Sequence, residues 1–213
     1  MIKAGFNTIR TILCLGAHAD DIEIGCGGAI LKLLEENQGA SVHWVVLHGS
    51  GDREGEAIRS AELFLAKARC HSIHIENFPD TLFPYRSEEI KAYFNDLGRR
   101  ISPDMVFTHR LEDRHQDHRL VSELTWNTFR DHMIMEYEIP KYEGDLGTPN
   151  IYVHLDESIC KQKIDFIVDS YATQKPKPWF SAETFWAMLR IRGIEAKSRS
   201  GFAEGVYCRK LVI

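Results

Sequence analysis

The chain of 213 residues lacks several features that would place it in a specialised class of protein. Its five cysteines are scattered and form no Cys-x-x-Cys pair, which argues against a disulfide framework or a cysteine-rich zinc site. No apolar run reaches the ~18 residues that a membrane helix needs, and residues 1–10 lack the apolar core of a signal peptide. These absences predict a cytoplasmic protein with reduced thiols and no membrane span.

An excess of positive charge is also missing. The formal net charge is -5 and the isoelectric point is about 6.1, which disfavours a nucleic acid or an anionic membrane surface as a partner. The chain contains no biased tract, internal repeat or linker. We therefore expect a single domain, residues 1–213, that is large enough to bury a substantial core.

Short apolar runs alternate with amphipathic segments along most of the chain. The expected strands are residues 12–17, 42–47, 72–75, 104–108 and 151–155, and the expected helices are 29–37, 54–69, 87–101, 120–130 and 158–171. This alternation predicts an α/β fold with a mostly parallel sheet and right-handed crossovers. Gly39 is expected to close the first helix, and Ser87 to cap the third.

The pattern becomes less regular from residue 174. A helix is expected over residues 182–191 and a final strand over 206–212, after a segment that contains two prolines. We interpret residues 174–213 as an irregular C-terminal cap on the same domain.

Two polar clusters follow directly after predicted strands. His18, Asp20 and Asp21 come after the strand over residues 12–17, and the run HQDH at 115–118 lies in the loop after the strand over 104–108. In the common doubly wound order 3-2-1-4-5, the first and fourth strands are neighbours, and their carboxyl ends border the ligand-binding crevice. We therefore expect the two clusters to face each other across that crevice.

The residue types in these clusters suit a catalytic metal. Zinc hydrolases typically use three nitrogen or oxygen ligands and leave a fourth position to water, and imidazole and carboxylate also suit iron, cobalt or nickel. His18 and Asp21 are three residues apart and can reach one metal from a single turn, and one histidine of the second cluster would complete the set. The remaining groups can serve as a general base and as an oxyanion stabiliser. This inventory predicts metal-assisted hydrolysis of an amide or ester.

The same residues resemble the signatures of a known family. The segment AHADDIEIGCGG is similar to the Ala-His-Pro-Asp-Asp-x-Glu…Gly-Gly signature of the LmbE-like, or PIG-L, N-deacetylases, and DRHQDH is similar to their Asp-x-His-x-Asp-His signature. HGSGDREGEAIRSAE and, more loosely, YATQ and GFAEGVYCR also resemble segments of that family. Ala19 stands where the family usually has proline, which loosens the turn but removes no ligand.

The resemblance implies a Rossmann-like three-layer sandwich and a set of roles for the site residues. Three residues would bind Zn²⁺: His18, Asp21 and His118. Asp20 would be the base that deprotonates the metal-bound water. His115 would stay off the metal and act on the oxyanion or the leaving amine, and Asp117 would orient a histidine through a hydrogen bond.

The resemblance also implies a substrate class. The expected reaction removes an N-acetyl or other N-acyl group from a small molecule, a glucosamine-type sugar or sugar conjugate, whose hydroxyl groups Arg59 and Asp52 would contact. Family members often form trimers or hexamers, which implies a homo-oligomer. Two alternatives stay open: a metal-dependent amidase for a non-sugar amide or thiol conjugate, and a metal-binding module without catalysis.

Simpler explanations apply to several neighbouring residues. Arg59 lies on an amphipathic helix and could pair with a glutamate on the same helix. The run of glycines at 25, 27 and 28 does not match Gly-x-Gly-x-x-Gly, so close packing of a helix on the sheet explains it better than dinucleotide binding. His48 and His109 also follow predicted strands, where a structural role is the simpler interpretation.

Overall fold

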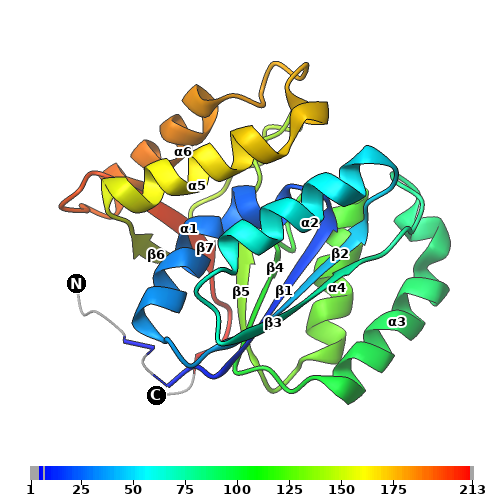
Figure 1. The fold of residues 1–213 in the computed structure, drawn as a ribbon. Helices are drawn as coiled ribbons and strands as arrows, with labels where there is room; N and C mark the ends of the chain where they lie inside the picture. Colours follow the sequence, from blue (N-terminus) through cyan, green and yellow to red (C-terminus); the bar gives the residue numbers. More distant parts are fainter. Residues whose placement is uncertain (1–4, 7, 212–213) are drawn as a thin grey trace.

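One seven-stranded sheet organises the computed structural model, which describes residues 5–6 and 8–211 (Figure 1). The strands are β1 (Thr11–His18), β2 (Ser41–His48), β3 (Cys70–Ile75), β4 (Met105–His109), β5 (Met133–Tyr137), β6 (Ile151–His154) and β7 (Ala203–Tyr207). Their order is β3-β2-β1-β4-β5-β7-β6. Strands β1 to β5 pair in parallel, whereas β7 pairs antiparallel with both β5 and β6. The predicted mostly parallel sheet, with the first and fourth strands as neighbours, is confirmed.

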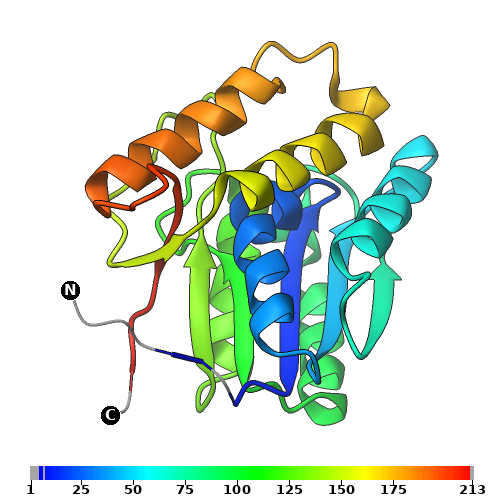
Figure 2. The ribbon, with the colours of Figure 1, turned by 60° about the vertical axis from the view of Figure 1, so that its left-hand side comes forward.

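Helices cover both faces of this sheet. They are α1 (Asp21–Glu36), α2 (Asp52–Phe64), α3 (Ser87–Arg100), α4 (Gln116–Thr128), α5 (Glu157–Ser170) and α6 (Ala182–Glu195), with short 3₁₀ turns η1 (Phe83–Arg86) and η2 (Ala172–Gln174). Figure 2 shows α1 in front of the sheet and the green helices α3 and α4 behind it. Helix α5 packs on α1 and α2, and α6 packs on α5 and β7.

The central strand β1 supplies side chains to two separate cores. Leu13 and Leu15 belong to the cluster that includes α3 and α4, while Ile12 and Cys14 belong to the cluster that includes α1 and α2. Successive side chains of a strand point to opposite faces, so a strand that is covered on both faces is apolar throughout. This double burial explains why the run before His18 contains no polar residue.

Glycines let α1 approach the sheet and its neighbouring helix closely, as the sequence predicts. A Cβ atom on Gly25 would lie 2.1 Å from Cδ2 of Tyr137, and one on Gly27 would lie 2.6 Å from the ring of Phe64. Side chains at these positions would push the first turns of α1 away from β5 and α2.

Strand β5 is not among the expected strands, and two other strands differ from the expectation in their place or bounds. The predicted strand over 151–155 is the sixth, at the edge of the sheet, and the predicted final strand begins earlier, at Ala203, and ends at Tyr207; residue 212 of that prediction lies outside the described residues. Strand β5 was missed because its short apolar pattern is interrupted by Glu136, which is fully buried. Glu136 accepts hydrogen bonds from Trp126 and Arg209, and these partners stabilise the buried carboxylate.

Several helix ends also differ from the prediction. Helix α1 begins at Asp21 instead of residue 29, and α4 begins at Gln116 instead of residue 120, so both polar clusters lie at helix starts. Helix α1 ends before Gly39: Asn37 occupies the C-cap and its side chain donates to the carbonyl of Leu33. Ser87 is the first residue of α3 and makes no capping hydrogen bond. In the part of the chain that the structure describes, no helix is long and apolar enough to span a membrane.

Candidate metal centre

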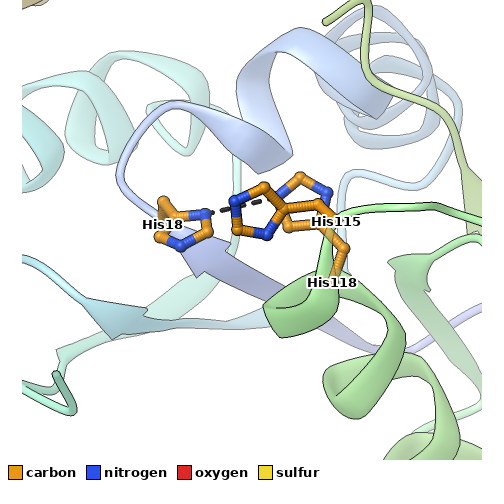
Figure 3. A group of neighbouring side chains, drawn as sticks. All are labelled: His18, His115 and His118. Atoms are coloured by element: carbon orange, nitrogen blue, oxygen red, sulfur yellow. Dashed lines mark hydrogen bonds between the residues drawn. The ribbon is translucent and has the colours of Figure 1, made fainter. Parts of the chain in front are cut away.

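The parallel pairing of β1 with β4 brings the two polar clusters together, as expected. His18 ends β1, and His115 and His118 stand at the start of α4, which follows β4. Figure 3 shows the three imidazole rings converging from these two elements. The ring centroid of His118 lies 5.2 Å from that of His18 and 4.5 Å from that of His115.

Three buried donor atoms form a nearly regular triangle. His18 Nδ1 lies 3.2 Å from His118 Nε2 and 3.4 Å from Asp21 Oδ2, and His118 Nε2 lies 3.5 Å from Asp21 Oδ2. Ligand atoms around a tetrahedral ion with bonds of ~2.1 Å are about 3.4 Å apart. Burial lowers the pKa of His118 to about 3, so its ring is neutral and keeps a lone pair for a metal. Against the effect of burial, hydrogen bonds to Asp117, Asp21 and Asp80 raise the pKa of His18, so a metal ion would replace a proton on that ring. With that exchange, the three residues fit a divalent transition metal in spacing and donor type.

Two further histidines lie beside this triangle. His115 caps α4, and its Nδ1 accepts the backbone N–H of Asp117. His109 is fully buried and stacks on His118 with ring centroids 3.9 Å apart, while its Nε2 accepts the backbone N–H of Ala17. Donor atoms of each of these histidines also group with donor atoms of the triangle. The sequence signal for His109 was only its place at the end of a strand.

Carboxylates hold the outer nitrogens of both histidines of the triangle. His18 Nε2 lies 3.2 Å from Asp117 Oδ2 and 3.0 Å from Asp80 Oδ1. His118 Nδ1 lies 3.0 Å from Asp113 Oδ2. Partners of this kind fix the ring orientation and raise the basicity of a metal-binding histidine. Asp117 thus contacts a histidine, and Asp80 and Asp113 are further histidine partners that the sequence did not predict.

Asp20 lies next to the triangle in a strained and buried position. Its φ is 92°, in the left-handed region, and only 5% of its surface is exposed. Its Oδ2 is buried and has no hydrogen-bond partner among the described residues. Burial and the charge of Asp21 raise the pKa of Asp20 to about 8, against the opposing effect of Arg53. This carboxylate can therefore take up a proton near neutral pH.

The turn around Asp20 is tied to the neighbouring strand and helix. The N–H of Ala19 donates to the carbonyl of His48 at the end of β2, at 3.1 Å. Arg53 Nη2 donates to the carbonyl of Ala19 at 2.7 Å and lies 3.4 Å from Asp20 Oδ1. These contacts hold Asp20 beside the triangle.

Arg53, and not Arg59 or Asp52, is the residue of α2 that reaches the polar clusters. Asp52 and Arg59 are exposed, and in the described part of the chain neither makes a hydrogen bond or ion pair with the clusters. Arg53 lies in the first turn of α2, whereas Arg59 stands six residues further, or about 9 Å along the helix axis. A substrate role for Arg59 and Asp52 stays a prediction.

A family model covers the stretch that builds this site. The PIG-L model, described as GlcNAc-PI de-N-acetylase, matches residues 13–129, from β1 through α4, which is more than half of the chain. The chain belongs to the PIG-L family.

Two curated relatives of this PIG-L family member are deacetylases by name. The uncharacterized deacetylase YaiS of Escherichia coli (strain K12) is 32% identical over 180 residues, which cover 79% of this chain and 88% of YaiS. The diacetylchitobiose deacetylase of Thermococcus kodakarensis is 32% identical over 120 residues, which cover 49% of this chain and 42% of that protein.

Solved structures share the fold at lower identity. The N,N'-diacetylchitobiose deacetylase of Pyrococcus horikoshii has a TM-score of 0.69 at 21% identity, over 95% of this chain and 85% of that one. GalB, the 4-carboxy-2-hydroxymuconate hydratase of Pseudomonas putida KT2440, has a TM-score of 0.71 at 21% identity, over 96% and 98%. The fold is therefore compatible with more than one reaction, and the side chains of the site must decide between them.

Proposed function

We propose that this PIG-L family member is a zinc-dependent hydrolase that removes an N-acetyl group from a glucosamine-type sugar or sugar conjugate. The observation that carries the proposal is the triangle of His18, Asp21 and His118 beside Oδ2 of Asp20, which has no hydrogen-bond partner in the described part of the chain. The two curated relatives support deacetylation, and the name of the Thermococcus enzyme supports an acetylated amino sugar.

The site residues have separate roles in amide hydrolysis. Zn²⁺ held by His18, Asp21 and His118 would supply Lewis-acid chemistry, polarising the carbonyl and making a water molecule acidic. Asp20 takes the proton of the attacking water at Oδ2 and can pass it to the leaving nitrogen.

His115 is placed to donate a hydrogen bond to the oxyanion or the amine. Its Nδ1 accepts the N–H of Asp117, so in the neutral ring the proton sits on Nε2. Burial lowers the pKa of His115 and so favours the neutral ring. A neutral donor can stabilise developing negative charge without binding the metal.

Two other expectations join this proposal. All seven strands belong to one sheet, which supports treating residues 1–213 as one domain, although β7, within the segment 174–213 that was expected to form a cap, lies inside the sheet between β5 and β6. A homo-oligomer is the expected assembly, and light scattering of the purified protein would measure its size.

Acetate release by the zinc-loaded protein tests the proposal directly. Asp20→Asn should retain zinc but lose about 10²- to 10⁴-fold of the rate on diacetylchitobiose or N-acetylglucosamine. Asp131→Asn, an exposed carboxylate in the connection between α4 and β5, is the matched control and should keep full activity. Full activity of both Asp20→Asn and His118→Ala would refute the catalytic assignment. Release of amine only from non-sugar amides would instead refute the sugar assignment.

A further inference from the structure

A buried chain of charges links His118 to the loop over residues 138–150. Asp113 Oδ2 contacts His118 Nδ1 on one side and accepts a hydrogen bond from Lys141 Nζ, at 2.9 Å, on the other. Lys141 Nζ also donates to Asp145 Oδ1 at 2.7 Å. The side chains of Asp113, Lys141 and Asp145 are 2%, 10% and 6% exposed. Charge pairs that are removed from water in this way are sensitive to the loss of one partner.

The same loop is also hydrogen-bonded to the segment that precedes α4. Asp145 Oδ2 accepts the N–H of Arg114, and Arg110 donates to the carbonyl of Asp145. Asp113 Oδ1 accepts the N–H of His115, so this one carboxylate positions the backbone before α4 as well as the ring of His118. A displacement of Lys141 would therefore remove a hydrogen bond from Asp113 and, through Asp113, loosen the orientation of the His118 ring.

The loop that is held in this way also presents large side chains to solvent. Tyr142, next to Lys141, is 77% exposed, and Leu146, next to Asp145, is 43% exposed. Lys141 and Asp145, the two loop residues in the buried charge chain, thus each precede an exposed aromatic or apolar residue in the sequence.

We propose that Asp113 and Lys141 are positioning residues that make the order of loop 138–150 and the binding of a metal at His118 mutually dependent. The inference rests on the proposed function, because it takes His118 as a metal ligand. A metal that fixes the ring of His118 also fixes Asp113, and Asp113 in turn retains Lys141 and the loop. Such coupling acts equally in both directions, so an ordered loop must favour metal binding.

Hydrogen exchange with and without Zn²⁺ tests the coupling without any activity assay. In the wild-type protein, Zn²⁺ should slow amide exchange both at residues 115–118 and in loop 138–150. Lys141→Met should lose the zinc-dependent protection of the loop while keeping it at 115–118. Lys141→Arg, which retains the charge, should restore loop protection, and Glu143→Gln, an exposed residue of the same loop, should behave as wild type.

A zinc titration of the apo-protein supplies the second measurement. Asp113→Asn keeps the shape of the side chain but loses its charge, and should bind Zn²⁺ about 10- to 100-fold more weakly. If Lys141→Met lowers the stability of the apo-protein but leaves zinc-dependent loop protection intact, its role is structural only and the inference is wrong. If wild-type protein binds no Zn²⁺, the proposed function falls together with the inference, whereas failure of the Lys141 variant alone leaves the proposed function standing.

Discussion

His18 and His118 point at the same candidate metal position but are held there by different means. The carboxylate behind His18, Asp117, is fully buried and accepts backbone N–H groups from Thr81 and Phe83 at 2.7 and 3.1 Å. The carboxylate behind His118, Asp113, also accepts one backbone N–H, from His115 at Oδ1, but the Oδ2 atom that contacts His118 is held by a lysine side chain from a loop. A backbone anchor is fixed by the fold, whereas a lysine has several rotatable bonds and can leave. The comparison indicates a rigid side of the site at His18 and an adjustable side at His118.

Asp117→Asn should give the largest effect, because it breaks the rigid side. An amide has a single acceptor oxygen, so one of the N–H groups of Thr81 and Phe83 would face an NH₂ group and remain unpaired. We expect zinc affinity to fall about 10- to 100-fold and the free energy of unfolding to fall by about 1–3 kcal/mol. Isothermal titration with Zn²⁺ and urea unfolding of the apo-protein would measure both. An unchanged unfolding midpoint would remove the distinction between the two sides.

Gly25→Ala should have an intermediate effect. It disturbs the packing of α1 on the sheet, which positions both histidines indirectly. Tyr137 packs on Gly25 and donates from its hydroxyl to the carbonyl of Leu15 in β1. A methyl group 2.1 Å from the tyrosine ring must displace it, which should cost about 1–3 kcal/mol despite the better helix propensity of alanine. Gly39→Ala is the matched control, because a Cβ atom there meets nothing within 4 Å. Equal thermal stability of the two variants would contradict the close packing of α1.

Asp80→Asn should have the smallest effect, although Asp80 lies closer to His18 than Asp117 does. The side chain of Asp80 is 45% exposed, and its ion pair with His18 is screened by water. We expect zinc affinity to change by at most about 1 kcal/mol, or roughly fivefold. The same zinc titration applied to Asp80→Asn and Asp117→Asn would sharpen the comparison. A larger loss for Asp80→Asn would mean that the exposed carboxylate, and not the buried one, orients His18.

The sequence predicted the part of the fold in which each strand is apolar and each helix amphipathic. Strand β1 illustrates this success, because its two buried faces leave a continuous apolar run that ends at His18. Strand β5 illustrates the limit, because Glu136 is buried only with the help of Trp126 and of Arg209, which is distant in the sequence. No local pattern could reveal that the distant arginine would pair with this carboxylate.

The same limit applies to the site. The two polar clusters and their meeting across β1 and β4 followed from spacing and from the common order of a doubly wound sheet. The partner of each histidine did not, since Asp80 and Lys141 come from connections whose course depends on tertiary contacts. The resemblance to the family pointed to Arg59, and the expected helix over 54–69 left Arg53 outside, whereas α2 begins at Asp52 and so includes Arg53 in its first turn.

The hydrogen bond from Ala19 to His48 gives the departure from the family signature a physical meaning. A proline at this position would fix φ of the turn before Asp20 but would have no N–H to donate. This chain has the opposite arrangement: the turn is free of a ring, and the end of β2 restrains it through the N–H of Ala19. Ring constraint and inter-strand hydrogen bond are therefore mutually exclusive ways to keep the same aspartate in place, and the second makes the geometry of the site depend on the neighbouring strand.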